Sequence, residues 1–154
     1  MEAATKKRLQ ELGAFALAGA HEPHQICQMA EMIRAARDYR WVGIYKIVAK
    51  DFVIMGKTGK CPPTYPRFPT TQGLASAAVD SKKSIIVADV QKDPRYLPTF
   101  ENTKSEIVVP VVLESGKAIG LIDVESDKLN AFTAADRDFL EHAAFVIAQA
   151  LASK

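Results

Sequence analysis

Apolar residues repeat every three to four positions near both ends of the chain, which is the spacing of one helix face. The first repeat predicts a helix over residues 2–18, which Gly19 ends. A second helix begins at Pro23, because proline suits the first helical turn. A last helix begins after Thr133, with Asp136 placed to complete a capping box. The apolar positions of the second and last helices are Ile26, Met29, Ala30, Ile33 and Ala36, and Leu140, Ala144, Ile147 and Leu151.

Between these helices the pattern changes to strands and loops. Residues 41–48 and 52–57 are rich in β-branched and aromatic residues and predict a hairpin. Four prolines exclude regular structure from residues 58–71, and a long loop is expected over residues 88–103. Two short elements are also predicted, a helix at residues 72–81 and a strand at residues 85–87.

A second hairpin, residues 105–113 and 117–125, would gather three acidic residues. With a two-residue turn between the strands, Glu106 faces Glu125, and Asp123 lies two positions from Glu125 on the same face. The other pairs of this register are Val108 with Asp123, Pro110 with Leu121 and Leu113 with Ala118. The remainder of the acidic face is apolar: Val108, Pro110, Val112, Ile119 and Leu121. The hairpins and helices together predict one α+β domain with a mainly antiparallel sheet.

Like charges directly opposite each other destabilise a sheet, so something must offset the acidic cluster. A raised pKa on one acid, a basic side chain such as Lys57, Arg67 or Lys104, or a cationic ligand would each do so. The simpler alternative is that the acids lie in water at a fraying strand end. Pro110 adds a constraint, because proline in an inner strand implies a bulge or a position without a partner.

Composition narrows the function classes. The 154 residues carry a net charge of +2, which gives no reason to expect a nucleic acid or an anionic membrane as partner. No apolar run reaches the roughly 20 residues of a membrane span, and the N-terminus lacks the order of a secretory signal, so we expect a cytoplasmic protein. Cys27 and Cys61 are expected to be reduced there. Neither cysteines nor histidines have metal-ligand spacing, so no metal or other cofactor is expected.

Several segments resemble the GAF domain family, and within it the free methionine-(R)-sulfoxide reductases. These segments are Trp41-Val42-Gly43-Ile44-Tyr45, Arg67-Phe68-Pro69, Gln72-Gly73-Leu74, Ser105–Pro110, Ile119–Ser126 and Phe132–Asp136. The resemblance covers nearly the whole chain. It implies a single GAF domain over residues 1–154, with a GAF/PAS-like antiparallel sheet of about five to six strands flanked by helices. The N- and C-terminal helices would pack together on one face.

The resemblance also implies a binding site. In these reductases, acidic residues that match Glu106, Asp123 and Glu125 hold the amino acid, and the last of them is normally aspartate. Residues that match Trp41 and Tyr45 would help to wall the pocket. The loop over residues 88–103 would close it.

The residues that would act on a bound sulfoxide do not match. The family requires a nucleophilic cysteine and a thiol that resolves the sulfenic acid. The nucleophilic cysteine of the family matches a position at about Thr99. The second family cysteine matches Ala75, and the third falls near Tyr65. Cys61 lies a few residues from the last of these and is the one candidate nucleophile, with Cys27 as its only available partner. We therefore do not expect reductase activity by the family mechanism.

Three functions remain open. The first is a stand-alone GAF domain that binds a small, amine-bearing molecule resembling an amino acid, in a sensory or signalling role. The second is a divergent free methionine-(R)-sulfoxide reductase that uses Cys61. The third is an interaction module with a vestigial pocket, in which the terminal helices form a homodimer.

Overall fold

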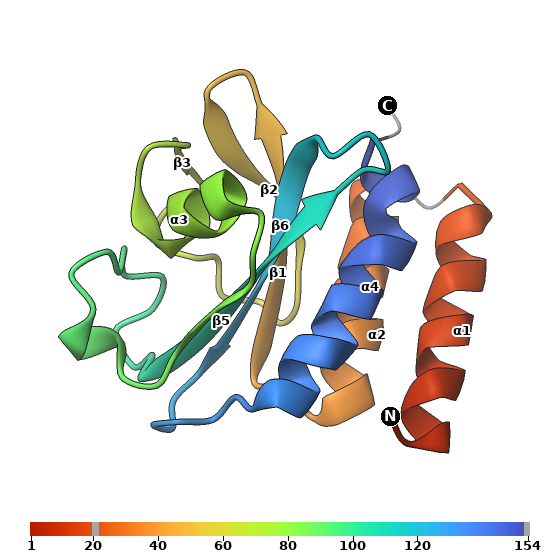
Figure 1. Cartoon of the computed structure of the whole chain (residues 1–154), viewed down its shortest axis with the longest axis horizontal. Coiled ribbons are helices and arrows are strands. Elements are labelled where there is room, and N and C mark those ends of the chain that lie inside the picture. The colour runs from red at the N-terminus through yellow and green to blue at the C-terminus, as the bar shows by residue number, and fades with distance from the viewer. Residues whose placement is uncertain (20–21, 153–154) are drawn as a thin grey trace.

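A computed structural model describes residues 1–19 and 22–152 of the chain. In this part of the chain, a six-stranded antiparallel sheet separates a layer of long helices from a short helix and loops (Figure 1). The helices are α1 (Ala3–Leu17), α2 (Pro23–Arg37), α3 (Gly73–Ser81) and α4 (Ala134–Ala152). The strands are β1 (Trp41–Val48), β2 (Asp51–Lys57), β3 (Arg67–Pro69), β4 (Ile85–Val87), β5 (Ser105–Val112) and β6 (Ala118–Ser126).

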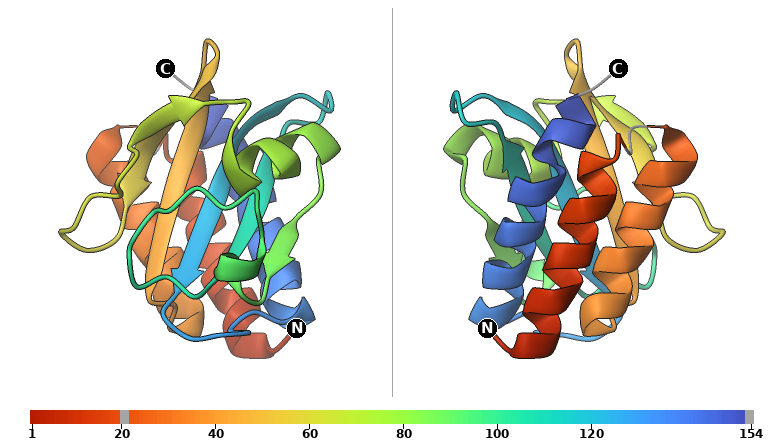
Figure 2. Two further views of the ribbon diagram at one scale, coloured as in Figure 1. Left: turned by 90° about the vertical axis from the view of Figure 1, so that its left-hand side faces the viewer. Right: turned by 90° about the vertical axis from the view of Figure 1, so that its right-hand side faces the viewer.

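The sheet order is β3-β2-β1-β6-β5-β4, so β1 and β6 lie at its centre. The helices α2 and α4 cover one face, and the N-terminal helix α1 packs against both of them on the side away from the sheet (Figures 1 and 2). The opposite face is covered by α3 and by the loop that follows β4. The predicted α+β architecture and the packing of the terminal helices are both confirmed.

The prediction that residues 58–71 contain no regular structure is wrong at one point. Residues Arg67–Pro69 form β3, which pairs with β2 at the edge of the sheet. Proline is tolerated in an edge strand because one side of that strand makes no ladder hydrogen bonds. The loop over residues 88–103 likewise contains one short turn of 3₁₀ helix, Val90–Lys92.

The β5–β6 hairpin has the predicted register at its open end. Glu106 pairs with Glu125 and Val108 with Asp123. Near the turn a bulge follows Val111, so Ala118 pairs with Val112 and not with Leu113. Since β4 reaches only as far as the residue opposite Val108, Pro110 has a neighbouring strand on one side only. The proline thus occupies a position where its missing N–H is tolerated.

Two apolar clusters lie on opposite faces of the sheet. The larger fills the space under the long helices and contains Ile107, Val109, Val111, Ile122 and Val124 from the hairpin. Ile119 also belongs to this cluster, contrary to the alternation we predicted. It is the extra residue of the bulge, because Val111 pairs with Gly120 and Val112 pairs with Ala118. The smaller cluster lies under α3 and contains Trp41, Tyr45, Val108 and Leu121. The three acids therefore stand beside a covered surface.

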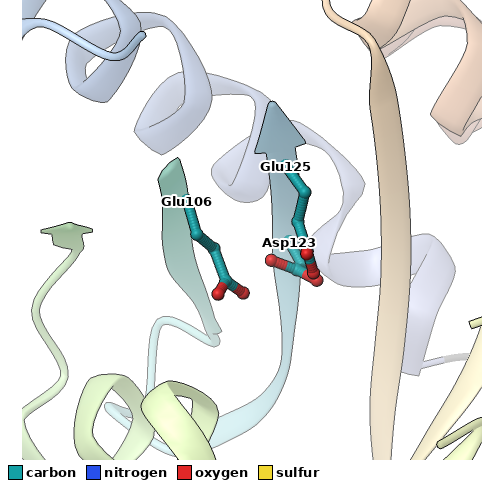
Figure 3. Close-up of side chains that lie close together, drawn as sticks. All are labelled: Glu106, Asp123 and Glu125. Carbon is teal, nitrogen blue, oxygen red and sulfur yellow. The ribbon is translucent and has the colours of Figure 1, made fainter. Parts of the chain in front are cut away.

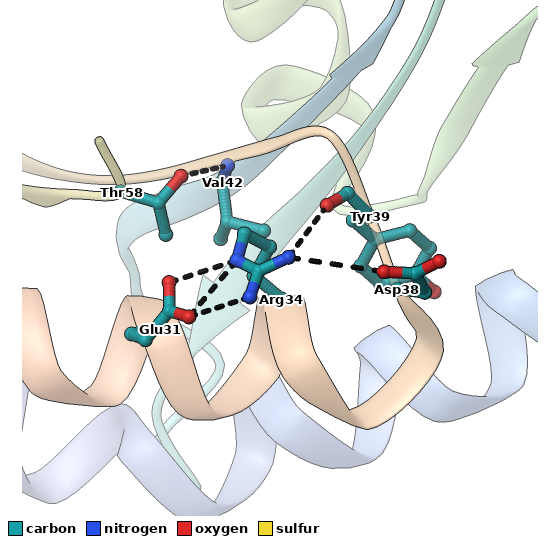
Figure 4. Close-up of polar contacts among 6 residues, drawn as sticks. All are labelled: Glu31, Arg34, Asp38, Tyr39, Val42 and Thr58. Atoms are coloured by element: carbon teal, nitrogen blue, oxygen red, sulfur yellow. Dashed lines mark hydrogen bonds and ion pairs between the residues drawn. The ribbon is translucent and has the colours of Figure 1, made fainter. Parts of the chain in front are cut away.

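Polar contacts at the end of α2 fix the start of β1 (Figure 4). Arg34 donates to both carboxylate oxygens of Glu31 and, at 3.3 Å, to the backbone carbonyl of Tyr39. The Val42 N–H donates to the hydroxyl of Thr58 at 3.0 Å, and the Thr58 N–H donates back to the Val42 carbonyl. These contacts hold the strand that begins with Trp41.

In the residues that the structure describes, we find no helix with the length and apolar character of a membrane span.

Candidate ligand-binding site

The side chains of Glu106 on β5 and of Asp123 and Glu125 on β6 converge on one point (Figure 3). Carboxylate oxygens from all three residues lie within 4.8 Å of one another. The residues are 5%, 4% and 1% exposed, respectively. The acids therefore do not lie in water at a strand end, and the alternative that placed them there is wrong.

Within the described residues, none of the three acids forms an ion pair. Two of the basic side chains proposed to offset them are engaged elsewhere: Lys57 donates to the Gly59 carbonyl, and Arg67 pairs with Asp51 at 2.8 Å. Burial, followed by repulsion from neighbouring carboxylates, raises the pKa of both Glu106 and Asp123 well above the ordinary value. Of the ways to offset the charge, a raised pKa therefore applies to Glu106 and Asp123.

Hydrogen bonding leaves part of this cluster unsatisfied. Thr103, at the end of the loop after β4, donates its hydroxyl to Glu125 Oε1 at 2.8 Å. Among the described residues, Asp123 Oδ1, Glu125 Oε2 and the indole Nε1 of Trp41 are buried without a hydrogen-bond partner. Unsatisfied buried polar atoms are uncommon and costly. Two unpaired acceptors and one unpaired donor in neighbouring residues indicate a place for a polar ligand.

The aromatic residues expected to wall the site stand on the neighbouring strand β1. Trp41 pairs with Glu125, and Gly43 pairs with Asp123. The indole ring lies over Gly43, where an added Cβ would be 2.3 Å from the ring. Phe100 from the loop packs edge-on against Trp41, with ring centroids 5.1 Å apart. Burial and the nearby charge of Asp123 raise the pKa of Tyr45, which keeps its hydroxyl neutral.

A cavity of about 30 Å³ lies over this face, between the acids and α3. That volume accommodates about two water molecules. Tyr45, Glu106 and Asp123 contribute to its wall, whereas Trp41 and Glu125 lie beside it. The loop residues that line it are Tyr65, Leu97 and Thr99. An amino acid therefore needs one of these loops to move before it can enter. The three carboxylates could also touch a metal ion, because one oxygen atom of each lies within 4.8 Å of the others.

The structure brings together the three positions at which the reductases would carry cysteine. Tyr65, Ala75 and Thr99 all line the cavity. The chain thus has the predicted cavity but no thiol at these positions. Cys61 is exposed and does not line the cavity. Cys27 is half-buried on α2, and its backbone packs against Gly56 of β2. Cys27 and Cys61 are both free thiols.

Several residues at the site were not predicted, and two of them come from the loop after β4. Leu97 lines the cavity and Thr103 bonds the acidic cluster, yet both lie in a loop that has no repeating pattern. Only the unusual length of that loop indicated a role for it.

An antiparallel sheet with helices on one face, and with a small cavity beside buried acids under a short helix on the other, defines a small α+β domain of the ligand-binding class. A model of the GAF domain matches residues 9–152. The chain therefore belongs to the GAF domain family.

Relatives of known name agree with this assignment. GAF domain-containing protein A of Dictyostelium discoideum is 32% identical over 122 residues, which is 77% of this chain and 76% of that protein. Free methionine-R-sulfoxide reductase of Saccharomyces cerevisiae is 35% identical over 115 residues, 73% of this chain and 63% of that enzyme. The structure of the type II free methionine-R-sulfoxide reductase from Thermoplasma acidophilum superposes with a TM-score of 0.79 at 30% identity, covering 91% of this chain and 94% of that one.

Proposed function

We propose that this protein binds a small, amine-bearing molecule of the amino-acid type in its GAF cavity and acts as a cytoplasmic sensory or signalling module. The observation that carries the proposal is the buried cluster of Glu106, Asp123 and Glu125, which has two unpaired oxygens and no ion pair in the described residues. The cluster lacks a positive charge and hydrogen-bond donors, and an ammonium group supplies both.

The relatives support an amino-acid ligand, since two of them are named for acting on free methionine sulfoxide. The cavity wall also supports it, because apolar residues such as Phe68, Leu74 and Leu121 lie beside the acids. Such a wall suits an uncharged side chain next to an ammonium group. A binding role is favoured over catalysis because the cavity presents hydroxyl, methyl and phenol groups where the reductases would carry thiols.

Free amino acids, with methionine and its sulfoxides among them, are expected to raise the melting temperature of the protein. At a concentration about a hundred times Kd the rise is roughly 5–10 °C. Glu106→Gln should remove the rise, because the glutamine keeps the shape of the site but not its charge. Glu114→Gln, an exposed change near the turn of the same hairpin, should leave the rise intact. If no amine produces a shift in the unmodified protein, the proposal is wrong.

Turnover distinguishes binding from the reductase alternative. In the proposed role, the protein consumes no thiol reductant in the presence of methionine sulfoxide. Steady consumption that stops in Cys61→Ser would instead establish the divergent reductase.

We also propose a homodimer, because one surface offers both a groove and side chains that would fill it. A groove of about 380 Å³ between α1 and α4 is lined in part by Gly13, Ala16 and Ala148. Leu17 and Phe145 border it and are 86% and 67% exposed. A second copy related by a two-fold axis can place its Phe145 into this groove, as an interface formed by the same surface on both copies requires.

Phe145→Glu is expected to convert the dimer into a monomer, because it places a charge in the apolar contact. Light scattering after size exclusion measures the mass. Leu129 is also an exposed apolar residue, but it lies outside the groove, so Leu129→Glu should leave the mass unchanged. A monomeric unmodified protein at micromolar concentration would refute the dimer without bearing on ligand binding.

A further inference from the structure

We propose that the buried cluster of Glu106, Asp123 and Glu125 is also a metal site, which binds one hard divalent cation such as Ca²⁺ or Mn²⁺ in the closed form of the protein. The cation and an amine use the same carboxylates, so each excludes the other. The competition rests on the proposed function, whereas binding of the cation does not.

The three carboxylates are spaced for a single ion. They point toward one another from β5 and β6 (Figure 3), and one oxygen atom of each lies within 4.8 Å of the others. Two oxygen atoms that bind the same Ca²⁺ ion at about 2.4 Å lie at most about 4.8 Å apart. All three acids therefore reach one ion with little movement of the strands.

Unpaired oxygen atoms in the cluster are a second observation that indicates a ligand. Among the described residues, Asp123 Oδ1 and Glu125 Oε2 have no hydrogen-bond partner, although their residues are only 4% and 1% exposed. The hydroxyl of Thr103 donates to the other oxygen of Glu125 at 2.8 Å, which holds this carboxylate in place and leaves Oε2 free. Carboxylate oxygen atoms are the ligands that hard cations prefer.

The described part of the chain supplies no cation to this cluster through an ion pair. None of its ion pairs includes Glu106, Asp123 or Glu125. Lys104, the remaining basic residue expected to offset the acids, is exposed to solvent. Buried charges in proteins are paired or bind a metal ion. A divalent cation offsets two of the three carboxylate charges, whereas an ammonium group offsets one.

The cavity beside the acids has the size that an ion requires. Its volume of about 30 Å³ holds about two water molecules, and Glu106 and Asp123 form part of its wall. Three carboxylates, one of them bound through both oxygen atoms, and two waters supply about six ligand atoms, and Ca²⁺ takes six to eight. The cation therefore fits while the loops are closed, whereas an amino acid enters only after one of them has moved.

Calorimetric titration of the full chain with CaCl₂, after treatment with EDTA and removal of the chelator, tests the metal site. We expect one ion per chain, and MnCl₂ should lose its free-ion signal in electron paramagnetic resonance at the same stoichiometry. Potassium chloride at equal ionic strength is the control for screening.

Variants of the cluster locate the ion. Glu106→Gln and Asp123→Asn keep the shapes of their side chains but remove a charged ligand, so each should weaken Ca²⁺ binding at least about tenfold. Glu114→Gln removes an exposed carboxylate near the turn of the same hairpin and should bind Ca²⁺ as the unmodified protein does. Melting curves of the metal-free variants establish that each is folded.

Competition tests whether the ion occupies the proposed ligand site. A competitor multiplies the apparent Kd of a ligand by one plus the ratio of its concentration to its own Kd. Ca²⁺ at about nine times its Kd should therefore raise the apparent Kd of L-methionine sulfoxide about tenfold.

The outcomes separate this inference from the proposed function. If L-methionine sulfoxide binds and neither Ca²⁺ nor Mn²⁺ does, the metal site is wrong and the amine site stands. If the ions bind and no amine does, the proposed function fails and the metal site stands. The metal site is also wrong if Glu106→Gln and Asp123→Asn bind Ca²⁺ as tightly as the unmodified protein, or if saturating Ca²⁺ leaves the affinity for L-methionine sulfoxide unchanged.

Discussion

Replacing Asp123 by asparagine is expected to stabilise the ligand-free protein by about 1–3 kcal/mol at pH 8. Asparagine keeps the shape of the side chain but removes one of three buried carboxylates that share a site without a cation. Burial, together with repulsion from Glu106 and Glu125, raises the pKa of Asp123 in the folded state. The same change should abolish the response to amines, so that stability rises as the function is lost.

The pH dependence identifies the cause. Below the unfolded pKa of an aspartate, near 4, Asp123 is protonated in both states and costs nothing. As pH rises, Asp123 ionises in the unfolded protein but stays protonated in the folded protein. The free energy of unfolding therefore falls until the pH passes the pKa of the folded state. The advantage of Asp123→Asn in urea unfolding should therefore be small at pH 4.5 and grow towards pH 8. An advantage that stays constant over this range would contradict the assignment.

Asp136→Asn serves as the matched control, because folding shifts the pKa of Asp136 in the opposite direction. Burial acts to raise the pKa of Asp136, but the N–H of Thr133 and the guanidinium of Arg37 outweigh it and hold that pKa below its usual value. Arg37 and the hydroxyl of Tyr39 each lie 2.8 Å from Oδ1 of this carboxylate. Its contribution to stability is present above the unfolded pKa and is lost as pH falls. The variant should cost about 2–4 kcal/mol at pH 7 and less at pH 4.

A methyl group at Gly56 is expected to lower the free energy of unfolding by about 2–4 kcal/mol. Gly56 lies in β2 where α2 crosses the sheet. An added Cβ would stand 2.6 Å from the backbone carbon of Ile26 and 2.7 Å from the backbone nitrogen of Cys27. Since both are backbone atoms, no side-chain rotation relieves the contact, and the helix must move away from the sheet. The urea midpoint of Gly56→Ala measures the loss.

Gly13→Ala is the control for this effect. Gly13 lies in α1, and the nearest atom to an added Cβ is 3.8 Å away, an ordinary contact. Alanine favours a helix over glycine by up to about 1 kcal/mol, so this variant should be slightly more stable. If both alanine variants have the same stability, the packing of α2 is looser than the structure indicates.

The alternation of residues in the hairpin was enough to predict the acidic cluster. The two-residue period and a short turn placed Glu106 opposite Glu125 with Asp123 on the same face, and the structure has that register. The bulge after Val111 could not be predicted, because an extra residue in a strand leaves the apolar pattern on either side almost unchanged. The strand β3 was missed for a related reason: three residues with a proline at one end show no periodicity.

What surrounds the acids was harder to predict than their pairing. Lys57 and Arg67 are candidate partners by their charge, but both are held by groups outside the cluster. The residues that close the cavity from above, such as Tyr65 and Leu97, come from loops whose paths depend on contacts distant in the sequence. The family resemblance supplied the positions of the absent thiols, which periodicity alone gives no means of finding.

The central place of β1 beside β6 has a consequence for how the protein folds. Trp41 pairs with Glu125, which is 84 positions later in the chain. Pairing at such separation requires a large loss of chain entropy before any contact forms, and proteins dominated by such pairs fold slowly. A ribosome-bound chain that has not yet released β6 lacks Asp123 and Glu125, and so it has no repulsion between buried acids. The acidic cluster can therefore form only in chains whose synthesis has passed β6.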